Sequence, residues 1–369
     1  MDRRQFLVAT AGLAGAALTA SFASSQTAAR PALPQPSPEK LPRWRGFNLL
    51  EKFNAARPAK FREEDFGIIA DWGFNFVRLP MSYLCWTDPA DWLKINDKVL
   101  ADVDQAVEFG KQYSVHVNLN LHRAPGYCVN PPKEPLDLWK DEAALDACAH
   151  HWAHLARRYK GVSSTRVSFD LLNEPPDIPA EQYVRVVTRL VHDIREQDPD
   201  RLIIADGLKT GTAPVPELAP LKVGQSTRGY TPSRVSHYHA SWVQGSADWP
   251  APTWPLDYTT SDKQGVEHHD HWDKERLRVR QIEPWKKLEA LGAGVHVGEW
   301  GSHNQTPHDV ALAWMGDYLD LWKEAGWGWA LWNLRGSFGV LDSGRKDVEY
   351  ESIRGHKLDR KMLELLRRG

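Results

Sequence analysis

Short apolar segments alternate with longer amphipathic segments from Trp44 to the C-terminus, and this alternation restricts the fold more than any other feature of the chain. The apolar segments predict buried strands over residues 45–49, 74–78, 115–121, 166–172, 202–205, 235–238, 294–298 and 328–332. The amphipathic segments predict helices over residues 63–72, 97–112, 141–159, 180–197, 215–221, 273–291, 307–325 and 357–367. A helix therefore separates each strand from the next.

Strict alternation of strands and helices indicates a parallel sheet, and eight strands close most naturally into a (β/α)₈ TIM barrel of the α/β class. A doubly wound open sheet is the alternative. It is disfavoured because no glycine-rich phosphate loop follows the first strand, and because polar motifs follow many strands instead of one switch point. The chain of 369 residues, 42% of them hydrophobic, is long enough for one barrel domain over residues 43–369.

The first residues resemble an export signal. An Arg-Arg-Gln-Phe-Leu motif at residues 3–7 precedes a run rich in Ala, Gly and Leu, and small residues at 21–23 suit cleavage. The motif resembles a twin-arginine signal, so we expect residues 1–23 to direct export to the periplasm or the outside of a bacterial cell. A membrane anchor is disfavoured because the run is short and weakly apolar. Residues 24–42, rich in Pro, Ala and Ser, predict a disordered spacer.

Charge and cysteine content exclude several classes of partner. The formal charge of −2 and the absence of a basic tract argue against nucleic-acid binding. Cys85, Cys128 and Cys148 show no metal-ligand spacing and cannot all pair. The segment 268–271 (His-His-Asp-His) contains residue types that bind metal ions, but adjacent loop residues rarely converge on one ion. We therefore expect a monomer without cofactor, metal or stable membrane anchor.

Two glutamates directly follow apolar strands. Glu174 lies in Leu-Leu-Asn-Glu-Pro, and Glu299 lies in Val-Gly-Glu-Trp-Gly. A carboxylate at the end of a buried strand is costly unless it has a function there, although either glutamate alone could simply open a loop. The chain also has 17 Trp, whose rings stack well on the apolar faces of sugars. Two carboxyl groups in such a chain suit glycosidic bond cleavage, which requires a proton donor and a nucleophile.

Other polar and aromatic side chains follow the predicted strands. Because the carboxyl ends of barrel strands meet at one mouth, we expect these side chains to face a common cavity. They are Arg78, His122, Asn173, His237, Tyr238, His239 and Trp332. The segment 240–272 is too long for an ordinary connection and is rich in tryptophan, which predicts a functional loop over that mouth.

This set resembles glycoside hydrolase family 5, a cellulase family in the clan whose catalytic carboxylates follow strands four and seven. The most specific motifs are Asn-Glu-Pro after strand four, Glu-Trp-Gly after strand seven and Trp332 after strand eight. The resemblance extends from about Trp44 to the C-terminus. It implies that Glu174 is the general acid/base and Glu299 the nucleophile.

The resemblance also implies roles for the supporting residues. Asn173 would bind the sugar 2-hydroxyl, and Arg78 would hold the nucleophile and keep it ionised. His122 and His237 would line the scissile subsite, and Trp332 would form its floor.

One motif departs from the family pattern. The family usually has a tyrosine two residues after the strand-six histidine, but here that position is His239 and the tyrosine is Tyr238. Residues 237 and 239 of an extended strand point to the same side, and residue 238 points to the other. Either Tyr238 or His239 is therefore a candidate for contact with the nucleophile, which indicates a divergent subfamily.

The chemistry of the two glutamates leads to a specific expectation. Arg78 would keep Glu299 ionised, whereas burial and the charge of Glu299 would raise the pKa of Glu174. We expect retention of anomeric configuration and a carboxyl separation of about 5–5.5 Å. The expected substrate is β-linked glucan or a related oligosaccharide. The alternatives are a β-mannanase or β-mannosidase, another exo-acting β-glycosidase, and a non-catalytic carbohydrate-binding barrel.

Overall fold

The computed structural model describes residues 31–88, 90–261 and 264–369, and residues 32–369 form one compact unit. Its main sheet is a closed parallel barrel, in the ring order β2-β1-β13-β12-β9-β8-β7-β5, with β5 pairing back to β2. The eight barrel strands are β1 (Arg45–Asn48), β2 (Phe76–Ser82), β5 (His116–Ala124), β7 (Val167–Asp170), β8 (Ile203–Asp206), β9 (Gly224–Gly229), β12 (Val295–Trp300) and β13 (Gly328–Leu331). The predicted (β/α)₈ barrel is confirmed.

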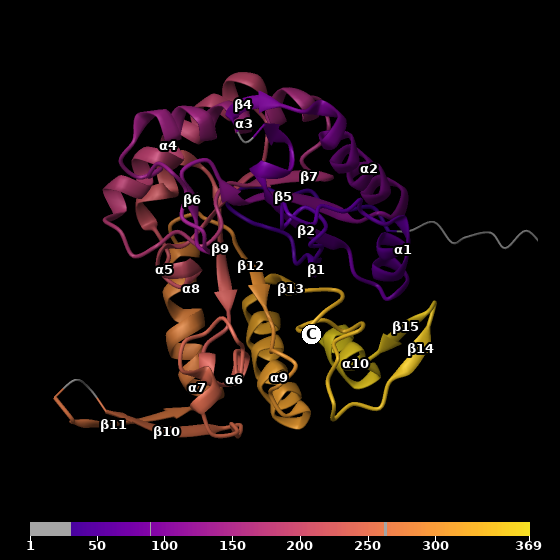
Figure 1. The fold of residues 1–369 in the computed structure, drawn as a ribbon, viewed down its shortest axis with the longest axis vertical. Coiled ribbons are helices and arrows are strands. Elements are labelled where there is room, and N and C mark those ends of the chain that lie inside the picture. The colour runs from indigo at the N-terminus through magenta and orange to yellow at the C-terminus, as the bar shows by residue number, and fades with distance from the viewer. Residues whose placement is uncertain (1–30, 89, 262–263) are drawn as a thin grey trace, which may run out of the picture. The chain divides into compact units, whose positions relative to one another are not determined.

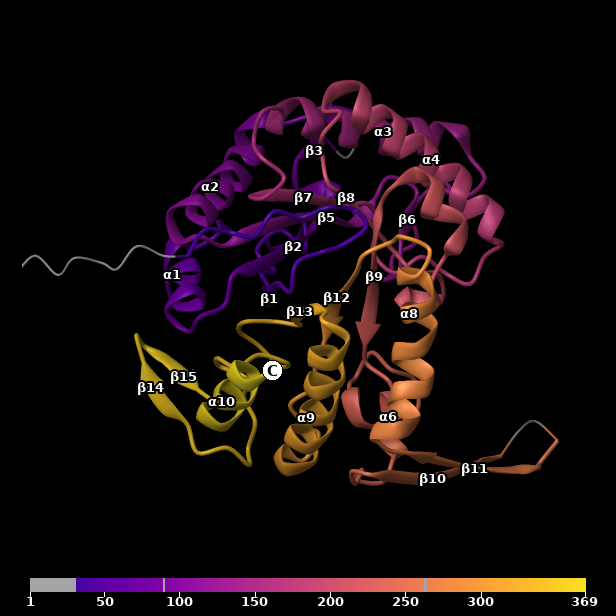
Figure 2. The ribbon, with the colours of Figure 1, turned by 180° about the vertical axis from the view of Figure 1, so that it is seen from behind.

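Helices follow the strands and cover the outside of the barrel, and Figures 1 and 2 show α1 to α4 arching along the outer side of β1, β2, β5 and β7. The α-helices are α1 (Glu63–Asp71), α2 (Asp97–Tyr113), α3 (Glu142–Tyr159), α4 (Ala180–Gln197), α5 (Leu208–Gly211), α6 (Ser233–Ser236), α7 (Lys274–Leu277), α8 (Glu283–Glu289), α9 (His308–Ala325) and α10 (Arg360–Arg368). Short 3₁₀ helices span Tyr83–Cys85, Pro216–Leu221 and Ser246–Asp248, and a π-helix at Arg278–Ile282 joins α7 to α8.

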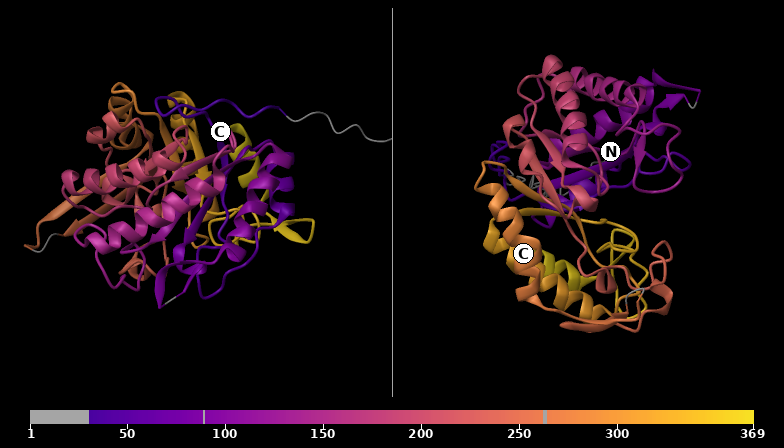
Figure 3. Two further views of the ribbon diagram at one scale, coloured as in Figure 1. Left: turned by 90° about the horizontal axis from the view of Figure 1, so that it is seen from above. Right: turned by 90° about the vertical axis from the view of Figure 1, so that its left-hand side faces the viewer.

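Smaller sheets lie outside the barrel. They are formed by β3 (Thr87–Asp88) with β4 (Asp91–Ile95), β10 (Leu256–Ser261) with β11 (Glu267–Trp272), and β14 (Glu351–Ile353) with β15 (His356–Leu358), while β6 (Tyr127–Cys128) pairs with the end of β5. The β10–β11 hairpin projects from the barrel (Figures 1 and 3). Within the described part of the chain, none of the helices has the length and hydropathy that crossing a membrane requires.

The sixth barrel strand differs from the prediction. Residues 235–238 do not form a strand, because Val235 lies in the short helix α6. The sixth strand is β9, whose Gly-Gln-Ser-Thr-Arg-Gly sequence has no apolar run, yet all six of its residues are buried. Polar side chains are tolerated there because they pair with other polar groups inside the barrel. A search for apolar runs therefore passes over this strand.

The N-terminal end of the barrel is closed by the segment before β1. Gly294 donates its backbone N–H to the carbonyl of Pro38 at 2.7 Å, and Leu41 is buried in a cluster with Trp44 and Phe76. Residues 37–42 thus pack on the barrel, which corrects the expectation of a disordered spacer over this part of 24–42. The predicted signal, residues 1–23, lies outside the described residues.

Candidate active site

Arg78 connects several of the predicted site residues in the barrel interior. Its Nη1 donates to Glu299 Oε1 at 2.7 Å, and its Nη2 donates to Asn173 Oδ1 at 2.9 Å. Its Nε donates to Asp170 Oδ2 at 2.7 Å, and its Nη1 also reaches Asn48 Oδ1 at 3.1 Å. Burial of a guanidinium is costly unless opposite charges and acceptors surround it, and here they do. The structure therefore brings Arg78, Asn173 and Glu299 together, as the sequence predicts.

Arg228 on β9 is a second buried cation that the sequence analysis missed. Its Nε donates to Glu174 Oε1 at 3.1 Å, and its Nη2 lies 3.5 Å from Glu299 Oε1. Both outer nitrogens of the guanidinium also bond the carboxylate of Asp206 at the end of β8. The register explains this position, because Arg228 pairs with Glu299 between β9 and β12. One guanidinium thus contacts both of the predicted catalytic carboxyl groups.

The backbone at Glu174 has a left-handed conformation, with φ of 51°. Its N–H donates to Asp206 Oδ2 at 2.9 Å, and its carbonyl accepts a hydrogen bond from the Tyr127 hydroxyl at 2.5 Å. A non-glycine residue rarely adopts this conformation, so these two contacts hold the turn that follows β7. Asp206 and Tyr127 are therefore part of the site, although no motif in the sequence indicates them.

The two glutamates have opposite pKa shifts. Burial, together with the charge of Glu299, raises the pKa of Glu174 to about 8, although Arg228 acts in the other direction. Burial also opposes ionisation of Glu299, but the charges of Arg228 and Arg78 outweigh it and hold the pKa of Glu299 below its ordinary value. One carboxyl group therefore favours the protonated form while the other favours the ionised form, as the sequence predicts.

Tyr230 supplies the hydroxyl that contacts Glu299. It follows β9 and donates to Glu299 Oε2 at 3.2 Å. Strand six therefore ends in Arg228-Gly229-Tyr230, with the tyrosine two residues after an arginine. In the described parts of the chain, neither Tyr238 nor His239 forms a hydrogen bond with Glu299, which corrects the expectation that one of them would.

The remaining predicted residues of strand six lie beside this group. The His237 ring packs edge-on against Tyr230, with centroids 5.0 Å apart. The Tyr238 ring stacks on His239, and the Tyr238 carbonyl lies 3.1 Å from His303 Nδ1. His239 is exposed. His237 thus adjoins the carboxylates through Tyr230, whereas Tyr238 and His239 contact each other and the loop after β12.

An aromatic group lies on another side of the site. The His122 ring stacks on Trp332 at 5.8 Å between centroids, and Phe53 packs against both rings. A cavity of roughly 350 Å³ opens beside Phe53 and His122, bounded by Asn54, Ser82, Arg123 and Asn130. Arg123 donates hydrogen bonds to Glu134 and to the backbone carbonyls of residues 130–132, and these bonds fix the cavity wall that contains Asn130. This arrangement forms a cavity with both apolar and hydrogen-bonding walls, which suits a sugar ring.

Several buried polar atoms in this region have no hydrogen-bond partner among the described residues. They include Asn173 Nδ2, His122 Nδ1, Ser82 Oγ and Asp170 Oδ1. A buried polar atom without a partner is costly, so such atoms mark positions where a ligand can supply the missing bond.

The segment 240–272 lies at the mouth only in part. Trp242 is 58% exposed and packs edge-on against His237 and His303. Farther along, Trp249 stacks on Arg234 near α6, and Trp254 Nε1 donates to Asp317 of α9. The distal part of the segment therefore packs against helices. The part of the predicted loop that lies at the mouth is the part that carries Trp242.

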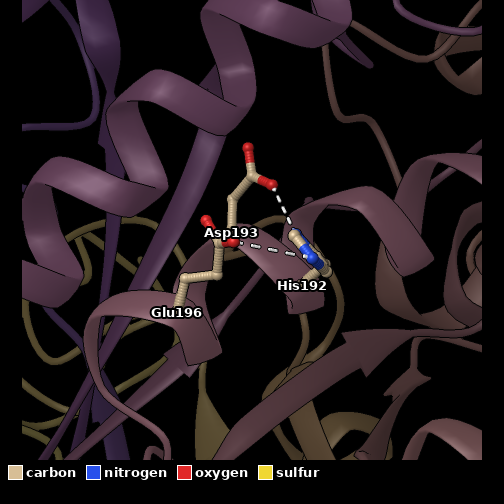
Figure 4. Close-up of side chains that lie close together, drawn as sticks. All are labelled: His192, Asp193 and Glu196. Carbon is tan, nitrogen blue, oxygen red and sulfur yellow. Dashed lines mark hydrogen bonds and ion pairs between the residues drawn. The ribbon is translucent and has the colours of Figure 1, made fainter.

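Two clusters of histidine and acidic residues lie on outer surfaces. His192, Asp193 and Glu196 of α4 place potential ligand atoms within 4.8 Å of one another (Figure 4), but the cluster is largely exposed and Arg189 pairs with Asp193. On β11, His271 Nδ1 lies 2.8 Å from Asp257 Oδ1 across the hairpin. Exposed groups of this kind are common without a metal, and neither cluster lies among the contacts of the two glutamates.

Comparisons with known proteins agree with the fold and identify the family. The family model for cellulase (glycosyl hydrolase family 5) matches residues 38–337. Endoglucanase C of Acetivibrio thermocellus is 24% identical over 309 residues, which cover 79% of this chain and 89% of the relative. Cellodextrinase A of Ruminococcus flavefaciens is 26% identical over 195 residues, covering 49% of this chain and 55% of that protein.

Solved structures have the same barrel. A crystal structure of a glycoside hydrolase superposes with a TM-score of 0.82 at 40% identity, covering 88% of this chain and 99% of the other. Cel5A of Thermotoga maritima in complex with cellobiose superposes with a TM-score of 0.68 at 21% identity, covering 88% and 96% of the two chains. Because the family model spans most of the barrel, the chain is an O-glycosyl hydrolase that belongs to glycosyl hydrolase family 5.

Proposed function

We propose that the protein is a retaining β-glycoside hydrolase that cleaves β-linked glucan or a related oligosaccharide by double displacement. The observation that carries this proposal is the contact of both carboxyl groups with Arg228, combined with the opposite shifts of their pKa values. Two carboxyl groups in one site, one protonated and one ionised, are what double displacement requires.

In the first step, Glu299 attacks the anomeric carbon while Glu174 delivers its proton to the departing glycosidic oxygen. The bond from the anomeric carbon to that oxygen breaks, and a glycosyl ester forms on Glu299. Arg78 keeps the attacking carboxylate ionised and oriented through its 2.7 Å bond to Glu299 Oε1. The unpaired Asn173 Nδ2 is the donor that we assign to the sugar 2-hydroxyl.

In the second step, Glu174 acts as the base. It takes a proton from water, the water oxygen attacks the anomeric carbon, and the ester bond to Glu299 breaks. Two displacements at the same carbon restore its original configuration. The product is a sugar with the β configuration at its new reducing end.

The walls of the site support a substrate of more than one sugar. We assign His122 and Trp332 to the sugar at the scissile bond, with Phe53 and the adjoining cavity beside it. Trp242 offers a second platform on the loop after β9, near His237. The similarity to endoglucanases and a cellodextrinase supports β-glucan as the substrate class. A β-mannan substrate is the second candidate, because Cel5A of Thermotoga maritima, 22% identical, has also been solved with mannotriose.

The decisive experiment is a screen of defined β-1,4-glucan, β-1,3-glucan and β-mannan oligosaccharides, followed by NMR of the first product. We expect hydrolysis of a β-glucan oligosaccharide and initial release of the β-anomer. Preferential hydrolysis of mannan would move the assignment to the second candidate. Initial release of the α-anomer would contradict the two-step mechanism, and binding without turnover of any oligosaccharide would indicate a carbohydrate-binding barrel.

Export is a separate part of the proposal. The Arg3-Arg4 pair supports export of the folded enzyme through a twin-arginine route. Replacement of both arginines by lysine should retain the enzyme in the cytoplasm of a bacterial host that has this route. Unchanged export of the double variant would contradict this assignment and would leave the catalytic proposal unaffected.

A further inference from the structure

We propose that Arg228 is a positioning residue that stabilises Glu174 as the ionised base for the second half of the reaction, once the charge of Glu299 is lost. This inference rests on the proposed function, because it presumes that Glu299 forms the glycosyl ester. Its basis is the position of one guanidinium between the two carboxyl groups, with Nε on Glu174 and Nη2 beside Glu299.

The Arg228 side chain is held in place by close packing as well as by charge. A Cβ atom added at Gly211 would lie 2.7 Å from Arg228 Cγ, and one added at Gly298 would lie 2.9 Å from Arg228 Nη1. Both separations are shorter than van der Waals contact, so only glycine leaves room for the Arg228 side chain at these positions. Ser226 Oγ and the Thr227 carbonyl accept further hydrogen bonds from Nη1. Arg228 therefore keeps one position while the charges around it change.

The charged and titratable groups around the pair come from every neighbouring strand. Besides the two glutamates they are Arg78 of β2, His122 of β5, Tyr127 of β6, Asp170 of β7, Asp206 of β8 and Tyr230 after β9. Asp206 bonds both outer nitrogens of Arg228 and takes part in neither displacement step. Among these groups, Glu299 is the one whose negative charge is removed when the glycosyl ester forms.

Formation of the glycosyl ester makes Glu299 neutral, so the site loses one negative charge next to Arg228. In the free enzyme, the charge of Glu299 opposes ionisation of Glu174. In the glycosyl enzyme that opposition is gone, while the Arg228 Nε remains 3.1 Å from the Glu174 carboxyl group. The arginine charge then stabilises the ionised form of Glu174, which is the base that deglycosylation needs. Loss of Arg228 should therefore impair the second step more than the first.

The test compares Arg228→Met, Arg228→Lys and the double variant R228M/D206N, which removes the buried cation together with its counterion. The matched control is R201M/D198N. Arg201 and Asp198 also form a buried ion pair, at 2.7 Å, but Arg201 bonds backbone carbonyls at the N-terminal end of β7 instead of the glutamates. A purely structural role would make the two double variants behave alike.

The measurements are the pH dependence of kcat/KM with a β-glucan oligosaccharide, whose leaving group needs the proton of Glu174, and the release of dinitrophenol from 2,4-dinitrophenyl β-cellobioside in the first turnover. In R228M we expect the alkaline limb to move upward by about one pH unit, because a cation beside Glu174 has been removed. In R228M/D206N the shift should be smaller, because the Asp206 charge, which raises the pKa of Glu174, is removed as well. We also expect kcat to fall by about tenfold or more and dinitrophenol to be released in a burst before the slower steady state. Azide should diminish this burst, because it replaces water as the attacking group and needs no base. Arg228→Lys, which keeps the charge, should retain the wild-type alkaline limb.

Unchanged pH limbs in R228M, or the same behaviour in R201M/D198N, would overturn the role of Arg228. If both Met variants fail to fold, Arg228→Lys still tests the proposal. A role based on charge predicts that the lysine variant keeps the wild-type alkaline limb, and a displaced limb would contradict it. Trapping the wild-type enzyme with a 2-deoxy-2-fluoro glycoside separates the two proposals. Absence of a covalent adduct on Glu299 would refute double displacement itself, whereas an adduct with unaltered R228M kinetics would refute this inference alone.

Discussion

At the scale of single residues, the site is a network of buried charges in which each group depends on its neighbours. Arg78 and Arg228 are both almost fully buried, and each contacts Glu299 and the Asn173 side-chain oxygen. Removing one member leaves another buried charge without its partner, which costs more than the loss of a surface ion pair. The consequences of substitution therefore depend on which charge is left behind.

Replacement of either glutamate by glutamine tests the assigned roles. We expect Glu299→Gln to abolish turnover while oligosaccharide binding by calorimetry persists, because the amide cannot form the ester. Glu174→Gln should lower kcat/KM, which reports the first step, by about 10²–10⁴-fold on oligosaccharides but much less on dinitrophenyl glycosides, whose leaving group needs no proton. Most activity retained in Glu299→Gln would show that the nucleophile is assigned wrongly.

The opposite pKa shifts predict a bell-shaped dependence of kcat/KM on pH in the wild-type enzyme. Activity requires Glu299 ionised and Glu174 protonated. The acid limb should lie below pH 4.5, because the arginine charges lower the pKa of Glu299 from that ordinary value. The alkaline limb should lie near pH 8, where Glu174 loses its proton. An alkaline limb near pH 5 would contradict the effect of burial on Glu174.

At the scale of elements, segments outside the eight strands complete the barrel. The segment before β1 places Leu41, only 5% exposed, against the N-terminal ends of the strands. This end lies opposite the carboxyl ends that carry the active site. The segment before β1 should therefore contribute to the free energy of unfolding without affecting the catalytic steps.

Leu41→Ala tests whether the segment before β1 contributes to stability alone. We expect it to lower the free energy of unfolding by about 2–5 kcal/mol, because it leaves a cavity beneath the barrel, with kcat unchanged below the melting temperature. Denaturant unfolding measures the first quantity. Leu291→Ala is the matched control, because Leu291 is 58% exposed and its loss should change stability very little. Equal stability of the two variants would show that the segment does not close the barrel.

At the scale of the whole molecule, the barrel brings loops from distant parts of the chain to one mouth. Phe53 follows β1, His122 lies in β5, and Trp332 follows β13, yet their rings are in contact. Trp242 comes from the loop after β9 and packs against His303, which follows β12. A substrate with several sugars can therefore meet side chains on more than one side of the catalytic pair.

Trp242→Ala tests whether this loop binds a second sugar. We expect KM for β-glucan oligosaccharides to rise about tenfold or more, since stacking on an exposed aromatic ring is lost, while hydrolysis of an aryl β-glucoside stays unchanged. Trp249→Ala is the control from the same segment, because Trp249 stacks on Arg234 instead. Equal effects on the oligosaccharide and on the monosaccharide glycoside would assign Trp242 a structural role.

Much of this arrangement follows from the sequence. The alternation of apolar and amphipathic segments predicts the barrel, and helix α4 has the predicted bounds Ala180–Gln197. Glu174 and Glu299 are recognisable because each is a charged residue that interrupts a buried, apolar context. Arg78 is recognisable for the same reason. Local periodicity and the cost of burying a charge are properties that a sequence displays directly.

Tertiary structure alone decided the sixth strand and the contacts made from it. The residues of β9 are polar because they face other buried polar groups, so their strand character depends on partners that lie far away in the sequence. Arg228, Asp206 and Tyr230 belong to the site only because strand register places them beside the two glutamates. The sequence by itself determined the barrel and its two carboxylates, whereas closure of the barrel determined which cations and hydroxyls surround them. The physical reason is that electrostatic interactions depend on distance in space, which chain order does not specify.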